Sequence, residues 1–344
     1  MIEIQNLSKK FGSLTAVDGL TLTIAEGEVF GLLGPNGAGK TTTIRMLAGL
    51  ISKTGGEATV AGCRVGDPDT ARKLRGLVGL MPEEAGLYLD LSAARTLDFY
   101  GRLYQVPAAA RAERTERLLT MLGLWDRRDA RVRTFSKGMK QRLTIARALI
   151  HDPAVLFLDE PTANLDPEGA KTVRDFLLQL KREQRTILLN THQLAEAERM
   201  CDRVGIMHTR LVAVGTPDGL RGAASRHATT VQLAVVTDAI VAAAREAATT
   251  ASTATTAAPE AGVTVDGNTI TVAVDKPERD NPRLVRAIVD AGGDVQFVSG
   301  IVPSLEETYL KLLATEKDTE KDTEKDTEKD TGQHPARHDE KNAR

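Results

Sequence analysis

Residues before position 34 follow the hydrophobic patterns of strands. Apolar and polar positions alternate over residues 2–7 and again over residues 20–24. Residues 29–33 form a continuous apolar run, which is typical of a strand covered on both faces, as in α/β proteins. We therefore predict three strands, the last of them deeply buried.

The next part of the chain changes to helical spacing. Apolar residues recur every three or four positions over residues 40–48, 95–122 and 137–150, which predicts helices there. Short apolar runs at 155–158 and 186–189 predict two more buried strands, with a helix over 168–182 between them. A strand, a helix and a second strand in this order predict an α/β fold with a parallel sheet.

The pattern changes again near residue 222, where a smaller α+β module begins. Its order is strand, helix, two strands, helix and strand, and the turn signal Gly267-Asn268 joins the central strands. This βαββαβ order suggests a ferredoxin-like module. The expected strands are 229–236, 262–266, 269–274 and 294–298, and the expected helices are 237–247, 282–291 and 304–314.

Two low-complexity segments accompany this module. Residues 248–258 are rich in Ala and Thr and are expected to form a flexible loop. From Glu316 onward the sequence Glu-Lys-Asp-Thr repeats four times, which places identical charges four residues apart. Such spacing is unfavourable in a helix, and the repeat has no apolar residue to dock. We expect a disordered tail over 315–344, with a solvated functional helix as the alternative.

Composition excludes several classes of protein. The chain has 344 residues, which is enough for about two domains. A net charge of −2 and 3% aromatic residues argue against a nucleic-acid-binding surface. Two distant cysteines rule out a disulfide scaffold and fit a reducing cytoplasm. The sequence has neither a signal-peptide pattern nor an apolar run near the roughly 18 residues of a membrane span, so another chain would have to supply the span.

A glycine-rich loop directly follows the predicted strand 29–33. It fits the pattern G-x-x-x-x-G-K-[ST] between a strand and a helix, as a phosphate-binding loop requires. Its glycines let backbone N–H groups turn toward phosphates, Lys40 reaches the β- and γ-phosphates, and the Thr41 hydroxyl can ligate Mg²⁺. The expected nucleotide-binding residues are Gly34, Pro35, Asn36, Gly37, Ala38, Gly39, Lys40, Thr41 and Thr42.

Two carboxylates end the predicted strand 155–158. Asp159 and Glu160 are placed at the carboxyl edge of the sheet, where ligands bind in open α/β sheets. Asp159 can hold Mg²⁺ through water, and Glu160 can accept the proton of an attacking water. Two carboxylates after a strand are usually only the start of a polar loop. The phosphate-binding loop upstream favours the functional interpretation.

The start of the predicted helix 137–150 has two interpretations. Ser136 is a good N-cap residue, and that role alone explains its position. A serine, a glycine and a helix N-terminus also make an anion site, and here Gly138 supplies the glycine. Both roles are compatible with one another.

Taken together, these motifs resemble those of ABC ATPases in order and spacing over residues 1–220. They are the phosphate-binding loop, Ser-Lys-Gly-Met-Lys-Gln at 136–141, Asp-Glu-Pro-Thr at 159–162 and Asn-Leu-Asp at 164–166. The resemblance implies that His192 is a switch histidine and that Phe11 stacks on adenine. It also implies that Glu83 occupies the position of the family's Q-loop glutamine, near Mg²⁺. The implied catalytic residues are Glu160, His192 and Glu83, and the implied metal ligands are Thr41, Glu83 and Asp159.

The resemblance also implies an architecture. Residues 1–221 would form a P-loop NTPase cassette of the ABC type, with a RecA-like core, an antiparallel β subdomain and a helical subdomain over about 84–150. Residues 222–314 would form the accessory α+β domain. Two such cassettes would face each other around two ATP molecules. Ser136, Lys137, Gly138 and Met139 would then contact the ATP of the second chain, and Asp166 would link the two sites.

Three departures from the usual motifs indicate one branch of the ABC ATPase family. Lys137, Met139 and Glu83 look like variants of the antibiotic and multidrug exporter branch, which is daunorubicin-resistance-like. Residues 302–310 resemble the terminal segment of its ATP-binding subunits. The segment also fits an ordinary helix that buries one apolar face, formed by Leu305, Tyr309 and Leu312.

We therefore expect an ATP-binding and ATP-hydrolysing subunit that uses ATP and Mg²⁺ and drives export of a drug or other small hydrophobic molecule. Its expected partners are a separate transmembrane permease, which would bind near residues 83–104, and a second cassette of the same chain. It would lie at the cytoplasmic face of the membrane. The alternatives are a non-transport ABC ATPase of translation or repair and a module that binds ATP without turnover.

Overall fold

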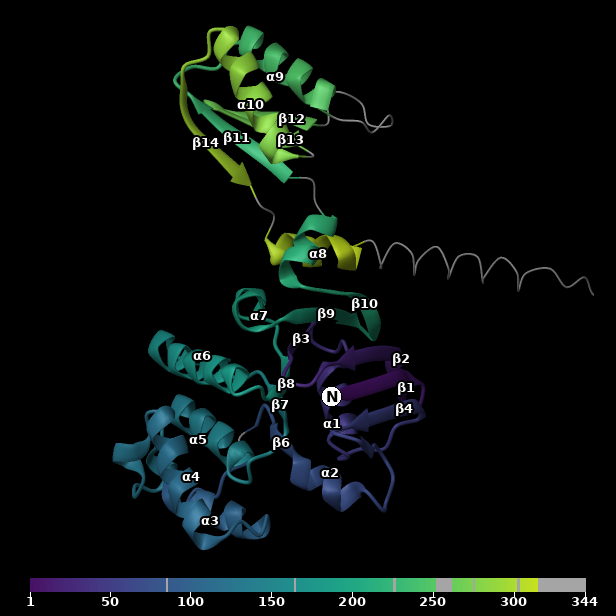
Figure 1. Ribbon diagram of the computed structural model, residues 1–344, viewed down its shortest axis with the longest axis vertical. Coiled ribbons are helices and arrows are strands. Elements are labelled where there is room, and N and C mark those ends of the chain that lie inside the picture. Colours follow the sequence, from purple (N-terminus) through teal and green to yellow (C-terminus); the bar gives the residue numbers. More distant parts are fainter. Residues whose placement is uncertain are drawn as a thin grey trace, which may run out of the picture. The chain divides into compact units, whose positions relative to one another are not determined.

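The computed structural model describes residues 1–84, 86–163, 165–224, 227–251, 262–274, 276–301 and 304–314. The chain divides into two compact units, Met1–Ala223 and Ala224–Arg344, which are coloured along the sequence in Figure 1. The Ala/Thr-rich loop expected at 248–258 falls mostly outside the described residues, and the expected tail at 315–344 lies wholly outside them.

A six-stranded sheet forms the centre of the first unit. Its order is β10-β9-β3-β8-β7-β6, and all strands are parallel except the edge strand β10. The strands are β3 (Val29–Leu33), β6 (Val78–Met81), β7 (Val155–Asp159), β8 (Thr186–Asn190), β9 (Arg203–His208) and β10 (Arg210–Gly215). Every residue of β3, β7 and β8 is buried, which confirms the prediction from their continuous apolar runs.

An antiparallel sheet packs beside the first helix (Figure 1). Its order is β2-β1-β4-β5, with strands β1 (Ile2–Phe11), β2 (Leu14–Ile24), β4 (Gly55–Val60) and β5 (Cys63–Arg64). Its alternating apolar residues share one hydrophobic core with β3, with α1 (Lys40–Leu47) and with Leu74 of α2 (Ala71–Leu77). The two predicted N-terminal strands are therefore confirmed, and they form the antiparallel β subdomain.

The helical subdomain contains one more helix than the sequence pattern predicts. Residues 95–122 are divided into α3 (Ala93–Leu103) and α4 (Ala108–Met121). The break occurs because Gln105 adopts a positive φ of 59° and Pro107 cannot donate a backbone hydrogen bond. Both helices contact α5 (Lys137–Leu149), so both keep an apolar face. The helical spacing of apolar residues therefore continues across the break, and the sequence pattern does not reveal it. Short 3-10 turns, η1 (Trp125–Arg127) and η2 (Val132–Thr134), lead into α5.

Three further helices follow the central strands. They are α6 (Pro167–Arg182), α7 (Leu194–Met200) and α8 (Pro217–Ala224). The prediction of a helix at 168–182 is confirmed within one residue. Among the described residues, no helix is both long enough and apolar enough to span a membrane.

The second unit has the strand order of a ferredoxin-like fold. Its sheet runs β12-β13-β11-β14, all antiparallel, and α9 and α10 pack on one face of it. The elements are β11 (His227–Leu233), α9 (Asp238–Ala251), β12 (Val263–Asp266), β13 (Thr269–Val274), α10 (Pro277–Asp290) and β14 (Val295–Ile301). Residues 305–314 are also helical. The predicted βαββαβ order is thus confirmed.

Element boundaries in the second unit differ from the prediction by up to five residues. The helix α9 continues to Ala251, into the segment expected to be a flexible loop. The largest difference is at the start of α10. The sequence pattern predicts this helix over residues 282–291. The helix in fact begins at Pro277. There the Asp280 carboxylate accepts a hydrogen bond from the Lys276 backbone N–H at 2.9 Å and stabilises an earlier start.

His151 joins the helical subdomain to the parallel sheet of the first unit. Its ring stacks on Tyr104 with centroids 3.8 Å apart and planes within 7°. Its Nε2 lies 3.1 Å from the Val78 carbonyl oxygen, so the neutral ring donates this bond. Burial lowers the pKa of His151 to about 4. The folded chain therefore favours neutral His151, whereas the unfolded chain protonates it below about pH 6.5.

We predict that His151 contributes to acid sensitivity. Between pH 6.5 and 4 the unfolded state binds more protons at this residue, so its stabilising contribution is complete above pH 6.5 and is lost as the pH falls. In urea unfolding at pH 7 and pH 5, the wild type should lose about 1 to 2 kcal/mol more than His151→Phe, which keeps the aromatic stack but cannot ionise. Equal losses in the two proteins would contradict the prediction.

Candidate functional site

The phosphate-binding loop joins β3 to α1 and depends on two glycines. Gly37 and Gly39 have φ values of 86° and 92°, in the left-handed region that favours glycine. A Cβ on Gly39 would lie 2.2 Å from the Ala16 carbonyl oxygen, so no side chain fits there. The loop therefore packs directly on β2, and its backbone is held in an open turn ahead of α1.

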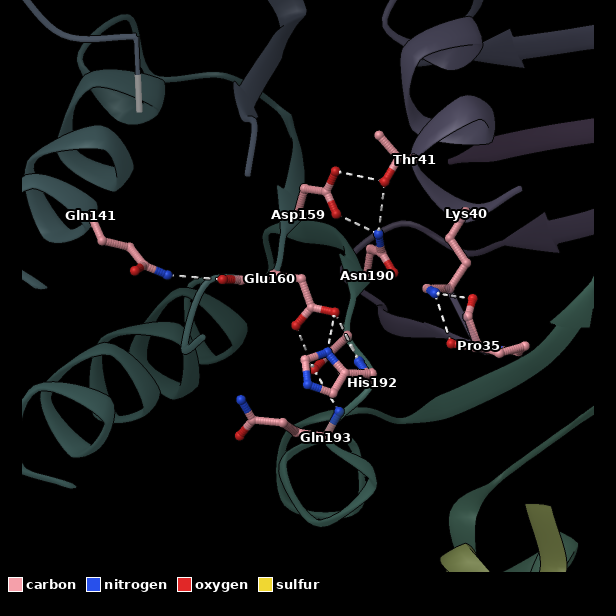
Figure 2. Close-up of polar contacts among 11 residues, drawn as sticks. Pro35, Lys40, Thr41, Gln141, Asp159, Glu160, Asn190, His192 and Gln193 are labelled. Carbon is pink, nitrogen blue, oxygen red and sulfur yellow. Dashed lines mark hydrogen bonds and ion pairs between the residues drawn. The ribbon is translucent and has the colours of Figure 1, made fainter. Parts of the chain in front are cut away.

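Lys40 points back into this loop (Figure 2). Its Nζ donates to the carbonyl oxygens of Gly34 and Pro35, at 2.7 and 3.0 Å. Burial lowers the pKa of Lys40, while the negative charges of Glu160, Asp159 and Glu83 oppose this shift. A phosphate in the loop would offer this cation a charged partner in place of two neutral carbonyls, so the loop fits a nucleotide phosphate.

Asp159 and Asn190 are buried at the ends of β7 and β8 and contact the half-buried Thr41 in the first turn of α1. Asp159 Oδ2 accepts a hydrogen bond from Thr41 Oγ1 at 2.9 Å, and Asp159 Oδ1 accepts one from Asn190 Nδ2. Burial raises the pKa of Asp159, while these two hydrogen bonds act in the opposite direction. The structure thus places a hydroxyl and a carboxylate side by side, as the sequence predicts.

This oxygen pair fits Mg²⁺. The ion prefers oxygen ligands and usually takes one or two from protein, with the rest from phosphates and water. Thr41 and Asp159 supply such a pair. No cluster of three or more His, Cys, Asp or Glu side chains suited to a metal exists in the described part of the chain. A metal held with the help of a nucleotide therefore suits this site better than a metal held by protein alone.

Glu160 lies next to this pair and contacts His192. Its carboxylate Oε1 lies 2.7 Å from His192 Nδ1 and accepts the His192 backbone N–H at 3.0 Å. Thr191 Oγ1 donates to Glu160 Oε2 at 3.4 Å. The Glu160 side chain is only 13% exposed, whereas that of His192 is 59% exposed. Two residues that the sequence separates by 32 positions therefore form one polar unit.

Glu83 and Phe11 lie on the borders of the site. Glu83 is exposed in the loop that follows β6, and its charge acts on both Lys40 and Asp159. Phe11 ends β1 with about half of its surface exposed, and Lys9 Nζ lies 4.8 Å from its ring centroid. Both side chains are accessible at the positions where the family resemblance expects contacts to a ligand.

Ser136 and Asp166 both cap helices in this chain. Ser136 Oγ accepts a hydrogen bond from the Met139 backbone N–H at 3.2 Å, at the start of α5. Asp166 Oδ1 accepts one from Gly169 N at 3.1 Å, at the start of α6. Ser136 and Lys137 are exposed, while Gly138 and Met139 are half-buried. The N-cap interpretation of Ser136 is therefore confirmed.

Three polar residues of the site were not predicted from the sequence. Asn190 and Thr191 end the apolar strand β8 just as Asp159 and Glu160 end β7, so the same rule of polar residues after a buried strand would have found them. Gln141 lies within α5 and donates to the carbonyl oxygens of Glu160 and Pro161. No sequence signal marks that contact, because it depends on how α5 packs.

Comparisons with known proteins agree with this geometry. Residues 17–163 match the family model described as "ABC transporter". The chain is 37% identical to the linearmycin resistance ATP-binding protein LnrL of Bacillus subtilis, covering 64% of this chain and 70% of that protein. It is 41% identical to the Nod factor export ATP-binding protein I of Ralstonia nicotianae, covering 64% and 68%.

Solved structures give the same result for the first unit. An ATP-binding subunit of an ABC transporter is similar with a TM-score of 0.60 and 33% identity, over 64% of this chain and 92% of that one. The ATP-binding cassette MJ0796, described as dimeric and bound to ADP and Pi after hydrolysis, is similar with a TM-score of 0.58 and 25% identity, over 63% and 98%. The chain belongs to the family of ABC transporter ATP-binding proteins, and its cassette is an ATPase.

Proposed function

We propose that this chain powers the export of a small hydrophobic molecule through a separate membrane-spanning subunit, at the cytoplasmic face of the membrane. The relatives named for linearmycin resistance and for Nod factor export support an export role. The observation that carries the proposal is the joint placement of Lys40, Asp159 and Glu160 with His192 at one sheet edge. That arrangement is suited to phosphoryl transfer to water.

Each side chain of the site has a separate task in this proposal. Lys40 and the backbone N–H groups of residues 34–42 bind the phosphates of ATP. Glu160 accepts the proton of the attacking water, since its carboxylate is partly exposed at the end of β7. His192 orients that carboxylate through the 2.7 Å contact. Phe11 offers its exposed ring to the adenine.

Thr41 and Asp159 would hold Mg²⁺, and Glu83 would approach it from the loop after β6. When bound, the ion neutralises the negative charge of the phosphate oxygens. The chain's own contribution is orientation. Asn190 and Thr41 each hold one oxygen of Asp159, so the carboxylate is fixed before any ligand arrives.

The second half of each ATP site would come from another copy of the chain. Ser136 and Lys137 are exposed at the start of α5, where the Ser136 hydroxyl caps the helix. The dimeric state of the similar cassette MJ0796 supports such a pairing. Ser136, Lys137, Gly138 and Met139 would then face the ATP held by the partner's loop. Asp166 would lie between the two sites.

The membrane subunit would dock on the aromatic surface near residues 83–104. Tyr88, Phe99 and Tyr100 form a cluster with ring centroids 5.3 to 6.4 Å apart. Beside it lies a groove of about 240 Å³ that Leu50 and Tyr104 help to line. A short apolar helix of a permease fits such a surface, because exposed apolar patches of this kind mark interaction sites. The similar protein cbiO1 is described as part of a transporter complex, cbiONQ.

The two alternatives have less support. A non-transport ABC ATPase that acts on nucleic acid would need a basic surface, whereas the net charge is −2. A module that binds ATP without turnover would not need a carboxylate in contact with a histidine beside the phosphate loop. Glu160 and His192 supply that pair.

We predict that Glu160→Gln binds ATP but loses hydrolysis. The amide keeps the shape of the side chain but cannot accept the proton, so phosphate release should fall by roughly 10²-fold or more. Glu26→Gln, an exposed carboxylate in the turn before β3, is the matched control and should hydrolyse ATP normally. Normal phosphate release from Glu160→Gln would remove Glu160 from the role of base.

We predict that ATP drives the Glu160→Gln chain from monomer to dimer and that Ser136→Asp blocks this shift. Aspartate is as good an N-cap as serine, so α5 should remain folded, but its charge would repel the γ-phosphate of the second chain. Light scattering with and without ATP measures the shift. Unaltered dimer formation by the doubly substituted chain would place Ser136 outside the shared site.

We predict that Leu89→Asp weakens binding to the permease. Leu89 is 49% exposed beside the aromatic cluster, so a charge there should disrupt an apolar interface without unfolding the chain. Co-purification with a membrane protein encoded by a neighbouring gene, and drug efflux from the same membranes, should both fall several-fold. Val289→Asp, at an exposed position of α10, should leave both unchanged. Equal behaviour of the two variants would argue against this docking surface.

A further inference from the structure

The side chain of Gln141 connects α5, the helix capped by Ser136, to the backbone of Glu160 and Pro161 directly after β7. Gln141 lies in the second turn of α5, and its Nε2 donates to the carbonyl oxygen of Glu160 at 2.8 Å (Figure 2). The same Nε2 donates to the carbonyl oxygen of Pro161, also at 2.8 Å. The amide group has two N–H donors, and each carbonyl takes one of them. Both donors of this side chain are therefore used on two consecutive peptide units that begin at the proposed base.

Those peptide units need such support, because the Glu160 backbone is strained. Its φ is 53°, in the left-handed region that non-glycine residues rarely adopt. Such a conformation is unfavourable for a residue with a side chain and persists only where the surroundings hold it. On one side the Glu160 N–H donates to the Asn190 carbonyl oxygen at 2.9 Å. On the other side the contacts are those of Gln141 and of the Ala163 N–H, which donates to the Glu160 carbonyl at 3.2 Å.

The strained conformation determines where the Glu160 carboxylate points. With it, Oε1 reaches both the ring and the backbone N–H of His192. A return of Glu160 to an ordinary backbone conformation would turn the side chain away from that pair. Gln141 thus acts on the reacting group through the backbone and makes no contact of its own with the carboxylate.

We propose that Gln141 is a positioning residue for the base of its own chain, holding the Glu160 backbone in the conformation that directs the carboxylate to His192. This inference rests on the proposed role of Glu160 in hydrolysis. Because Gln141 lies five residues after Ser136, about 7.5 Å along the same helix, it also ties the start of α5 to the base of the same chain.

The first test removes the donor while keeping the size of the side chain. Gln141→Leu should lower kcat about 10-fold, the loss expected when hydrogen bonds to a strained loop are removed, and KM for ATP should stay within about 2-fold. Gln141→Glu should lower kcat at least as much, since a carboxylate would face two carbonyl oxygens. Gln179→Leu, an exposed glutamine of α6, is the matched control and should leave kcat unchanged. A change confined to KM, or none, would overturn the proposal.

The second test asks which chain's base Gln141 serves. Two differently tagged chains are co-expressed with the membrane subunit and purified on both tags, so that each complex contains one of each. In the reference complex, one chain carries Glu160→Gln and the other is wild type. Adding Gln141→Leu to the chain that already carries Glu160→Gln should leave the reference rate unchanged. Placing Gln141→Leu on the other chain, beside the only intact base, should lower the rate about 10-fold.

The outcomes of this second test separate the two hypotheses. The reverse pattern, or equal rates in the two arrangements, would overturn the role of Gln141 in its own chain. Full activity of a pair in which both chains carry Glu160→Gln would instead overturn the assignment of Glu160 as the base.

Discussion

The site depends on the parallel register of β3, β8 and β7, which brings three chain segments to one edge of the sheet. Leu32 pairs with Asn190, and Asn190 pairs with Asp159. Parallel strands end on the same side, so the residues that follow them must meet there. The hydrogen bonds of Asp159 to Thr41 and to Asn190, and the contact of Glu160 with His192, follow from that register.

Burial of charge is the second constraint on this edge. Lys40 and Asp159 are both largely removed from water, which lowers the pKa of the first and raises that of the second. Each shift is the cost of holding a charged group in a protein interior. The neighbouring carboxylates only partly offset it for Lys40, and the hydrogen bonds from Thr41 and Asn190 only partly offset it for Asp159. A bound nucleotide and cation would supply the missing opposite charges. The same groups that make the free site electrostatically unfavourable are therefore those that would bind the ligand.

Local backbone strain completes the arrangement. Glu160 takes a left-handed conformation that its side chain does not favour, and hydrogen bonds from α5 and to β8 hold it there. Because α5 belongs to the helical subdomain and β8 to the parallel sheet, the conformation of Glu160 depends on both parts of the cassette.

Local signals along the chain were enough to predict most elements of the fold. Continuous apolar runs gave β3, β7 and β8, the Gly37 and Gly39 pattern gave the phosphate loop, and element order gave the ferredoxin-like second unit. The break between α3 and α4 was missed, because the apolar spacing continues across it. The contact of Gln141 with Glu160 could not be predicted, since a hydrogen bond between a helix side chain and a distant loop depends on packing and leaves no periodic pattern in the sequence.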